Sequence, residues 1–424
     1  MIQDIKYGGQ HVQVEIPDRL SPNVILPRHQ KSSELSSAEI IRAALDHPIG
    51  ADTLKNSVKP GSKVCLLVND ITRLTKSDLF VPALVDELNA CGIPDSDITV
   101  LFANGMHEQM SEADMRRIIS DAAYERVNIV QHDCLNAEFV YVGTTTRGTE
   151  VRVNKVAYDA DFLILTGGIV PHHIAGFGGG RKDIIPGCAK RETIVNNHKM
   201  VIDPRAFAGN IVDNPMHLDL MEACAFVNPS YLFNVILDER GEIYEAVAGH
   251  WREAYMEGVR IAKGLYVYPI EKEYDVAIVS CGGAPKDIDL RQSKKGFINS
   301  SNAVKQGGTI ICFAACPEGV TKEARLDNFS EVLFKHDDIE PIKEIIRKDF
   351  TIGALNAFKV RNTQKKARLI LITDIPKEEM NTLRIEAYPV SEAQSVIDSV
   401  LAEGDPSVIV IPQAGLTLPI VEKI

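Results

Sequence analysis

The run DFLILTGG, residues 161–168, is one of several short apolar segments that end in Gly, Asn or Asp. It lacks the alternation of apolar and polar residues seen in half-exposed strands, so it is typical of a strand buried on both faces of a parallel sheet. Comparable runs occur at 63–70, 98–105, 128–133, 231–238, 274–283, 307–315 and 368–374. Helical patterns such as 75–92 and 111–127 lie between them, with apolar residues three and four positions apart. This alternation predicts an α/β protein with open, mostly parallel sheets flanked by helices.

The strand-like runs form two series, which indicates two domains in this 424-residue chain. The polar segment 264–275 separates the series. We therefore predict an N-terminal domain of residues 1–270 and a C-terminal α/β domain of residues 271–404. The final segment, 405–424, contains another apolar run, and we expect it to return to the N-terminal domain.

Composition limits the possible partners. The chain has 46 Lys and Arg against 58 Asp and Glu, a formal charge of −12, and binding to nucleic acid or an anionic membrane needs clustered basic residues. No stretch approaches the roughly 20 apolar residues of a membrane span, and the N-terminus lacks the apolar core of a signal peptide. We expect a soluble, cytoplasmic protein without nucleic-acid or membrane partners. The eight cysteines are scattered without a CxxC pair, so buried reduced thiols are expected.

Ionisable residues cluster just after the predicted strands, where ligands bind in open α/β sheets. The loops are NDITR with Asp70 and Arg73, NGMH with His107, PHHIAGFGGGRK ending at Lys182, and GGAPKDIDLRQSKKG at 282–296. These four loops are the predicted site.

The glycine-rich segment GFGGGRKDIIPGC, residues 176–188, allows two interpretations. Gly178, Gly179 and Gly180 permit positive φ and close backbone approach, so they could bind a phosphate or carboxylate. A Walker A loop is excluded because Asp183 follows Lys182. A Rossmann fingerprint is excluded because eight residues lie between Gly168 at the end of the strand and Phe177. The alternative is a mobile surface loop with a solvated Lys182.

Three histidines favour a functional site. His107, His172 and His198 each lie near a strand end or a loop that can reach one, and with the neighbouring cations they could ligate a metal, transfer protons and bind a carboxylate. His198 lies in the helix-like segment KRETIVNNHKM, residues 190–200, which suits a fixed metal ligand better than a mobile base.

Taken in order, NDITR, NGMH, PHHIAGFGGGRKDIIPG with NNH, and QxxK in RQSKKG resemble the motif set of the nickel-pincer lactate racemase family. The resemblance runs from about residue 10 to the C-terminus. It implies a two-domain protein whose N-terminal domain binds the cofactor and whose active site lies in the interdomain cleft. The implied cofactor is the nickel-pincer nucleotide, a pyridinium-3-thioamide-5-thiocarboxylic acid mononucleotide, and cofactor-biosynthesis proteins are implied partners.

The resemblance also implies roles for individual residues. Lys182 would be linked covalently to the cofactor, and His198 would be a nickel ligand, which suits the tetragonal preference of Ni(II). His107 and His172 would be the acid/base pair; His172 is chosen over His173 because it lies ten residues before the lysine. The implied substrate-binding residues are Asp70, Arg73, Gln292 and Lys295, with Asp70 orienting the site. Gly178, Gly179 and Gly180 would let the backbone pack against the cofactor, and Arg181 would help to neutralise its phosphate.

The implied reaction is racemisation or epimerisation at C2 of a 2-hydroxy carboxylate by reversible hydride transfer. Arg291 stands where lactate-specific members carry tyrosine, which favours a second carboxylate or a polyhydroxy tail on the substrate; the alternative is a surface arginine. NDITRL lacks the histidine and proline of the lactate-type stretch, and GALNAFKVRN, residues 353–362, contains no tryptophan. We therefore expect malate, a longer 2-hydroxy acid or an aldonate rather than lactate.

Two other classes of function stay open. The three histidines could surround zinc in a metal-dependent hydrolase. The chain could also be a non-catalytic relative that binds a cofactor or nucleotide for storage or transfer.

Overall fold

The computed structural model describes residues 1–28, 35–321, 328–402 and 404–421. The chain forms two compact units. The central unit comprises residues 29–265, and the terminal unit comprises residues 1–28 together with 266–424.

A six-stranded sheet forms the centre of the central unit, in the order β13-β12-β9-β4-β5-β6. The strands are β4 (Val64–Asn69), β5 (Ile98–Ala103), β6 (Asn128–Gln131), β9 (Phe162–Gly168), β12 (Tyr231–Leu237) and β13 (Ile243–Gly249). All neighbours are parallel except β12 and β13. The chain leaves β4 in one direction through β5 and β6, and re-enters beside β4 at β9. Strand order therefore reverses between β4 and β9, the position where an open sheet leaves room for a ligand at its carboxyl edge.

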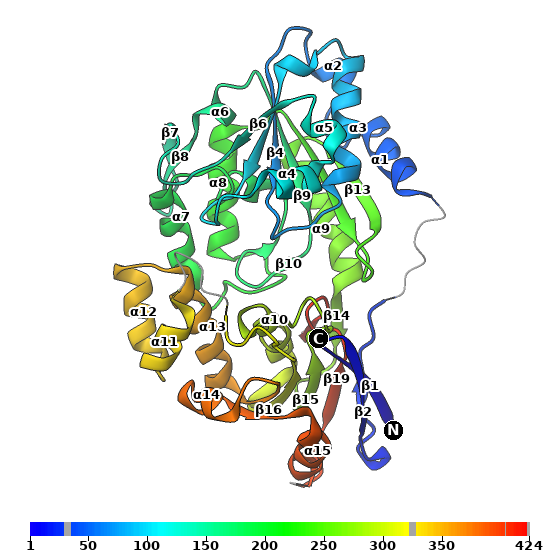
Figure 1. The fold of residues 1–424 in the computed structure, drawn as a ribbon, viewed down its shortest axis with the longest axis vertical. Coiled ribbons are helices and arrows are strands. Elements are labelled where there is room, and N and C mark those ends of the chain that lie inside the picture. The colour runs from blue at the N-terminus through cyan, green and yellow to red at the C-terminus, as the bar shows by residue number, and fades with distance from the viewer. Residues whose placement is uncertain (29–34, 322–327, 403, 422–424) are drawn as a thin grey trace. The chain divides into compact units, whose positions relative to one another are not determined.

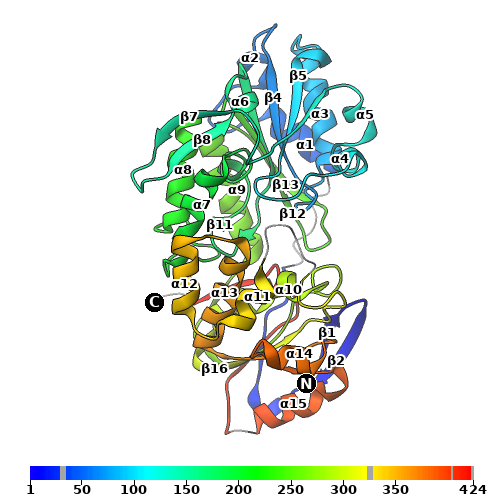
Figure 2. The same cartoon turned by 60° about the vertical axis from the view of Figure 1, so that its left-hand side comes forward.

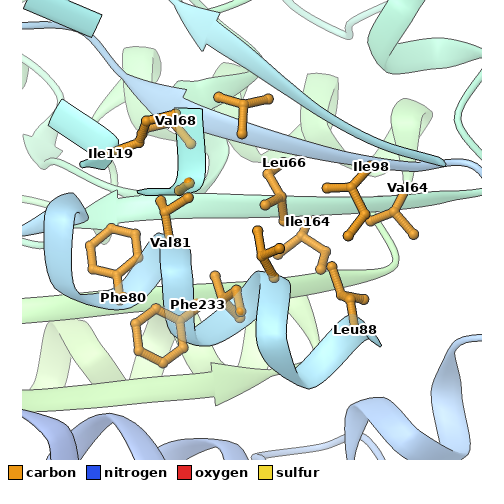
Figure 3. Close-up of a cluster of buried hydrophobic side chains, with 14 of the residues drawn as sticks. Val64, Leu66, Val68, Phe80, Val81, Leu88, Ile98, Ile119, Ile164 and Phe233 are labelled. Carbon is orange, nitrogen blue, oxygen red and sulfur yellow. The ribbon is translucent and has the colours of Figure 1, made fainter. Parts of the chain in front are cut away.

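Helices cover both faces of this sheet (Figure 1). On one face lie α1 (Ser37–Asp46), α3 (Ser77–Ala90) and α4 (Glu112–Ile119), and on the other lie α7 (Arg191–His198) and α8 (Pro215–Val227). Capping boxes at Ser36 and Ser111 fix where α1 and α4 begin. Figure 3 shows Phe80 and Val81 of α3 with Leu66 and Phe233 of the sheet in one buried apolar cluster. This core holds the carboxyl ends of the strands rigidly.

The terminal unit contains a second six-stranded sheet, which is parallel throughout and ordered β18-β17-β16-β15-β19-β3. Its strands are β3 (Asn23–Val24), β15 (Tyr274–Ser280), β16 (Val304–Phe313), β17 (Arg368–Ile372), β18 (Glu386–Tyr388) and β19 (Val408–Ile411). The N-terminal hairpin of β1 (Ile2–Tyr7) and β2 (Gln10–Glu15) packs with α15 (Ala393–Leu401) in one apolar cluster, and Figure 2 shows the start of the chain beside α15. The helices α10 (Leu290–Ser300) and α13 (Ile352–Lys366) belong to the same unit.

The structure confirms the predicted α/β class but divides the chain differently at its ends. Residues 1–28, predicted to belong to the N-terminal domain, join the terminal unit, because β3 adds to the edge of its sheet with Asn23 opposite Ile409. The tail 405–424 was expected to return to the N-terminal domain, but β19 pairs with β15, and β20 (Leu418–Val421) pairs with β14 (Val267–Ile270). An apolar run such as VIVI predicts a strand buried in a parallel sheet, but it does not indicate which of the two sheets the strand joins.

Two further expectations concern the chain as a whole. All eight cysteines are free thiols and seven are buried, which confirms their predicted role as packed side chains. Within the described residues, no helix combines the length and the apolar character needed to cross a bilayer.

Candidate active site

Asp70 and His107 follow neighbouring strands, β4 and β5, and form the first element of the site. The Asp70 Oδ2 atom lies 2.5 Å from His107 Nδ1, and Asp70 Oδ1 accepts hydrogen bonds from the backbone N and the Oγ1 of Thr72 at 2.8 and 2.6 Å. Burial acts to raise the pKa of Asp70, but the hydrogen bond and charge of His107 outweigh it, and the pKa lies below its ordinary value. Asp70 is thus an ionised carboxylate that accepts the Nδ1 proton of His107, which leaves Nε2 of His107 as a proton acceptor.

His172 lies on a tight hairpin formed by β10 (Pro171–His172) and β11 (Gly176–Phe177). Its Nδ1 accepts a hydrogen bond from the backbone N of Ala175 at 3.3 Å, so the proton of the neutral ring is assigned to Nε2. Burial, and next the charge of Lys182, hold the pKa of His172 well below its ordinary value. His173 stacks on His172 with ring centroids 4.8 Å apart. The two predicted acid/base histidines therefore differ in the state of Nε2: His107 accepts a proton there and His172 carries one.

Lys182 lies in the short 3₁₀ helix η3 (Gly180–Asp183), with Nζ 3.4 Å from Nε2 of His172. Burial, followed by the charges of Arg73 and Arg181, lowers the pKa of Lys182 to about 7. A large share of this amine is therefore neutral at neutral pH, the form that acts as a nucleophile. The glycine segment is buried and Lys182 is half-buried, so the alternative of a solvated surface loop is wrong.

The glycines serve internal packing. Gly179 and Gly180 have φ of 73° and 52°. A Cβ atom would lie 2.7 Å from Asn234 Oδ1 at Gly179, and 2.7 Å from the Tyr255 ring at Gly180. A side chain at either position would therefore collide with β12 or with α9 (Trp251–Tyr266). This internal packing explains the need for glycine, and the approach of a cofactor to the backbone of these glycines stays a prediction.

Arg181 also differs from its predicted role. Its guanidinium is completely buried, and it lies over the ring of Tyr255 at 4.5 Å from the ring centroid. It donates to the carbonyl oxygens of Phe177 (2.8 Å), Gly178 (3.2 Å), Gly179 (3.2 Å) and Ala175 (2.8 Å), and to Nδ1 of His217 (3.1 Å). The predicted neutralisation of a phosphate by Arg181 does not fit this geometry, because the donors are directed at the protein's own carbonyls.

His198 is the last residue of α7 and faces the same group of residues. Burial, and next the charge of Lys182, lowers the pKa of His198 to about 3, so the ring is neutral, the form in which imidazole ligates a metal. The preceding Asn197 donates to Oδ2 of the buried Asp219 at 2.8 Å, which anchors this end of α7 to α8. The neutral ring of His198 could bind a metal ion, and the neutral amine of Lys182 could carry a group that supplies the other metal ligands. No group of three His, Cys, Asp or Glu residues suited to a metal ion occurs in residues 1–28, 35–321, 328–402 and 404–421.

The structure brings together six predicted site residues in the central unit: Asp70, Arg73, His107, His172, Lys182 and His198. Arg73 is exposed, and its charge acts on the pKa of both His172 and Lys182, so its cation lies close to them. The three predicted substrate-binding residues Arg291, Gln292 and Lys295 lie in α10 in the terminal unit, where Lys295 Nζ donates to Gln292 Oε1 at 3.1 Å. Participation of α10 in the site, and the interdomain cleft itself, stay predictions.

Several polar residues that support the site were not predicted from the sequence. Asn69 Nδ2 donates to Asp183 Oδ1 at 3.0 Å, and Asn234 Oδ1 accepts from the backbone N of Gly180 at 2.9 Å. Thr72 holds Asp70, and His217 accepts from Arg181. One signal was available for the two asparagines, because each interrupts or ends an otherwise apolar strand, VCLLVN and YLFNVIL.

Known proteins resemble the chain along almost its whole length. Residues 7–209 match the lactate racemase N-terminal domain, and residues 270–418 match the lactate racemase C-terminal domain. The lactate racemase of Thermoanaerobacterium thermosaccharolyticum is 28% identical over 426 residues, 99% of each chain, and that of Lactiplantibacillus plantarum is 30% identical over 333 residues, 78% of each. The crystal structure of the Thermoanaerobacterium apoprotein superimposes with a TM-score of 0.90 at 28% identity, covering 99% of this chain and 100% of that one. A Thermotoga maritima protein shares the fold alone, with a TM-score of 0.68 at 21% identity, over 91% of this chain and 98% of that one.

The α/β fold and these matches together define an isomerase, an enzyme of the racemase type. The chain belongs to the lactate racemase family.

Proposed function

We propose that this protein inverts C2 of a 2-hydroxy carboxylate, as a racemase or epimerase, using a nickel-pincer nucleotide linked to Lys182. One observation carries the proposal. His107 and His172 have opposite proton assignments at Nε2, and His172 lies against Lys182, whose pKa is lowered to about 7.

The two histidines suit proton transfer to and from the substrate hydroxyl. His107 Nε2 takes the hydroxyl proton from one enantiomer while Asp70 stabilises the resulting imidazolium. His172 would supply a proton from Nε2 to the carbonyl oxygen after uptake of a second proton, as an imidazolium that its lowered pKa makes a strong acid. Two such groups are needed because the enantiomers present their hydroxyls in different directions. In the reverse reaction the two histidines exchange roles.

The cofactor, when bound, would supply the group that exchanges a hydride with C2. Removal of a hydride avoids deprotonating a carbon beside a carboxylate, which is a very weak acid. Lys182 would carry the cofactor through its neutral amine, and the neutral ring of His198 would be the protein's nickel ligand. Arg73 would bind the substrate carboxylate, since it is an exposed cation beside His172 and Lys182. Gln292 and Lys295 would add substrate contacts, in line with their motif.

We propose a substrate other than lactate: malate, a longer 2-hydroxy acid or an aldonate. The relatives with a named activity are lactate racemases. Arg291 adjoins Gln292 in the first turn of α10, where its cation suits a second carboxylate or hydroxyl groups on the substrate. Substitution of Arg291 by Met should then lower kcat/KM for malate far more than for lactate, as measured by chiral chromatography of each product pair.

The geometry gives less support to the alternatives. A hydrolase would need His107, His172 and His198 to converge on one zinc ion, and no such group of three is found in the part of the chain that the structure describes. A carrier would have no use for the hydrogen bond by which Asp70 orients His107.

The decisive experiment combines intact mass and nickel content for protein produced in a host that makes the cofactor. Wild-type protein should carry an added mass that maps to the peptide containing Lys182, with nickel near one per chain. Lys182→Ala should lose both, whereas Lys190→Ala, a half-buried lysine in the same unit, should keep both. Unmodified wild-type protein, under cofactor supply verified with a known lactate racemase, would overturn the covalent assignment.

A further inference from the structure

The sequence Arg181-Lys182-Asp183 forms a turn of 3₁₀ helix, and its three side chains diverge. A 3₁₀ helix has about three residues per turn, so consecutive side chains project about 120° apart. Arg181 points toward His217 of α8 and Tyr255 of α9, and Asp183 points toward Asn69 at the end of β4. The two flanking side chains are thus held from different sides, and Lys182 projects between them toward His172.

Arg181 binds the peptide that carries the site rather than a ligand. Four carbonyl oxygens, those of Ala175, Phe177, Gly178 and Gly179, accept from its two terminal nitrogens. A planar guanidinium can collect several acceptors in fixed directions, which a lysine ammonium at one point cannot do. The hydrogen bonds of Arg181 all go to neutral acceptors, four carbonyl oxygens and His217, and burial lowers its pKa. Burying a cation among neutral acceptors is costly, so a neutral side chain would suit a purely structural role better.

The same backbone segment orients His172. Ala175 accepts from Arg181 through its carbonyl oxygen and donates to Nδ1 of His172 through its backbone N. A shift of this segment would change the proton assignment on His172 as well as the direction of Lys182. The cation of Arg181 also acts on the amine of Lys182, where it disfavours the charged form.

We propose that Arg181 is a positioning residue, which fixes the backbone of residues 175–179 and thereby sets the Lys182 amine and the His172 ring before any cofactor is attached. The proposal rests on the role proposed above for Lys182 and deepens it. Arg181 touches neither substrate nor cofactor; it acts through the peptide groups and the local charge.

The test measures the reactivity of Lys182 in the apoprotein. Acetic anhydride acetylates neutral amines, so the labelling rate of the Lys182 peptide between pH 5.5 and 9, measured by mass spectrometry, reports the fraction of neutral amine. Lys348, whose side chain is 79% exposed, serves as the internal reference. Arg181→Met should raise the pH midpoint of Lys182 labelling by about one unit, because the neighbouring cation is lost. At pH 7 the labelling of Lys182 relative to Lys348 should then fall about fivefold. Arg205→Met, an exposed arginine in the same unit, should leave the ratio unchanged.

Folding of each variant is checked by circular dichroism before labelling. Arg181→Lys keeps the charge but not the planar fork, and it should also lower the relative labelling of Lys182; it decides the test if Arg181→Met fails to fold. Wild-type labelling rate and midpoint in a folded Arg181 variant would overturn the proposal, because a side chain needed only for stability would leave Lys182 unaltered once the protein is folded. The proposed function fails separately. Wild-type protein that never gains the cofactor mass would refute the tether even if Arg181 controls the amine.

Discussion

Replacement of Asp70 by Asn tests how far the site depends on the charge-assisted hydrogen bond between Asp70 and His107. Asp70 is 4% exposed and lies 2.5 Å from His107, with two further hydrogen bonds from Thr72. Asn has nearly the same shape but no charge, so the substitution removes the charge-assisted bond while it keeps the side-chain volume. His107 then loses both its fixed tautomer and the group that stabilises its protonated form.

The structure sets the size and the pH dependence of the effect. A hydrogen bond to a charged group contributes about 1.5–3 kcal/mol, and the lower end applies because ionised Asp70 also bears a desolvation cost that Asn avoids. For a unit of this size, about 1.5 kcal/mol corresponds to a fall of roughly 3–6 °C in Tm. The folded pKa of Asp70 lies below its ordinary value, so its stabilisation is present above about pH 4 and is lost as the pH falls through the folded pKa. The difference between wild type and variant should therefore shrink in acid.

Calorimetry of the apoprotein at pH 7 and pH 3.5 measures this difference without cofactor. In the loaded enzyme, kcat should fall about 10- to 100-fold with little change in KM, since the bond acts on the protonated histidine of the reaction. Asp203→Asn, which breaks a pair with Arg205 away from the site, should change Tm little and kcat not at all. Equal Tm values for wild type and Asp70→Asn at pH 7, together with unchanged kcat, would refute the reasoning.

Three further predictions follow from packing and ligand chemistry. Gly180→Ala should lower Tm by several degrees, because φ is 52° and the new methyl group would lie 2.7 Å from the ring of Tyr255. Gly61→Ala, where φ is 83° but no atom lies near the new methyl group, should lower Tm less. Equal decreases in Tm would contradict the packing argument. Native protein should react with about one equivalent of Ellman's reagent, at the half-buried Cys91, and with all eight thiols only after denaturation; several fast thiols in the native state would contradict the burial pattern. His198→Ala should lose nickel yet keep the organic mass on Lys182, as measured by metal analysis and peptide mass, and full nickel retention would remove His198 from the ligand set.

The strands and the α/β class could be predicted from the sequence because each depends on a local pattern. Runs such as VCLLVN and FLILTGG are apolar on both faces, which only a covered parallel sheet satisfies. The assignment of segments to units could not be predicted in the same way. The two-residue strand β3 has almost no pattern of its own, and it is held at the sheet edge by pairing with β19, some 385 residues later. Such pairing depends on tertiary contacts, and no pattern in the sequence near β3 predicts it.

The glycine segment shows the corresponding limit for the site. Its composition left two interpretations open, a backbone that binds a phosphate or carboxylate and a mobile surface loop, and the family resemblance implied packing against a cofactor. In the structure the missing Cβ atoms instead make room for Asn234 and Tyr255, and Arg181 turns inward to bind carbonyls. A backbone that packs closely against a ligand and one that packs closely against other protein atoms both need glycine. The sequence could therefore predict the close packing but not which atoms lie against the glycines. The direction of each side chain came from the 3₁₀ geometry of residues 180–183, and that geometry explains why a buried arginine directly precedes the reactive lysine.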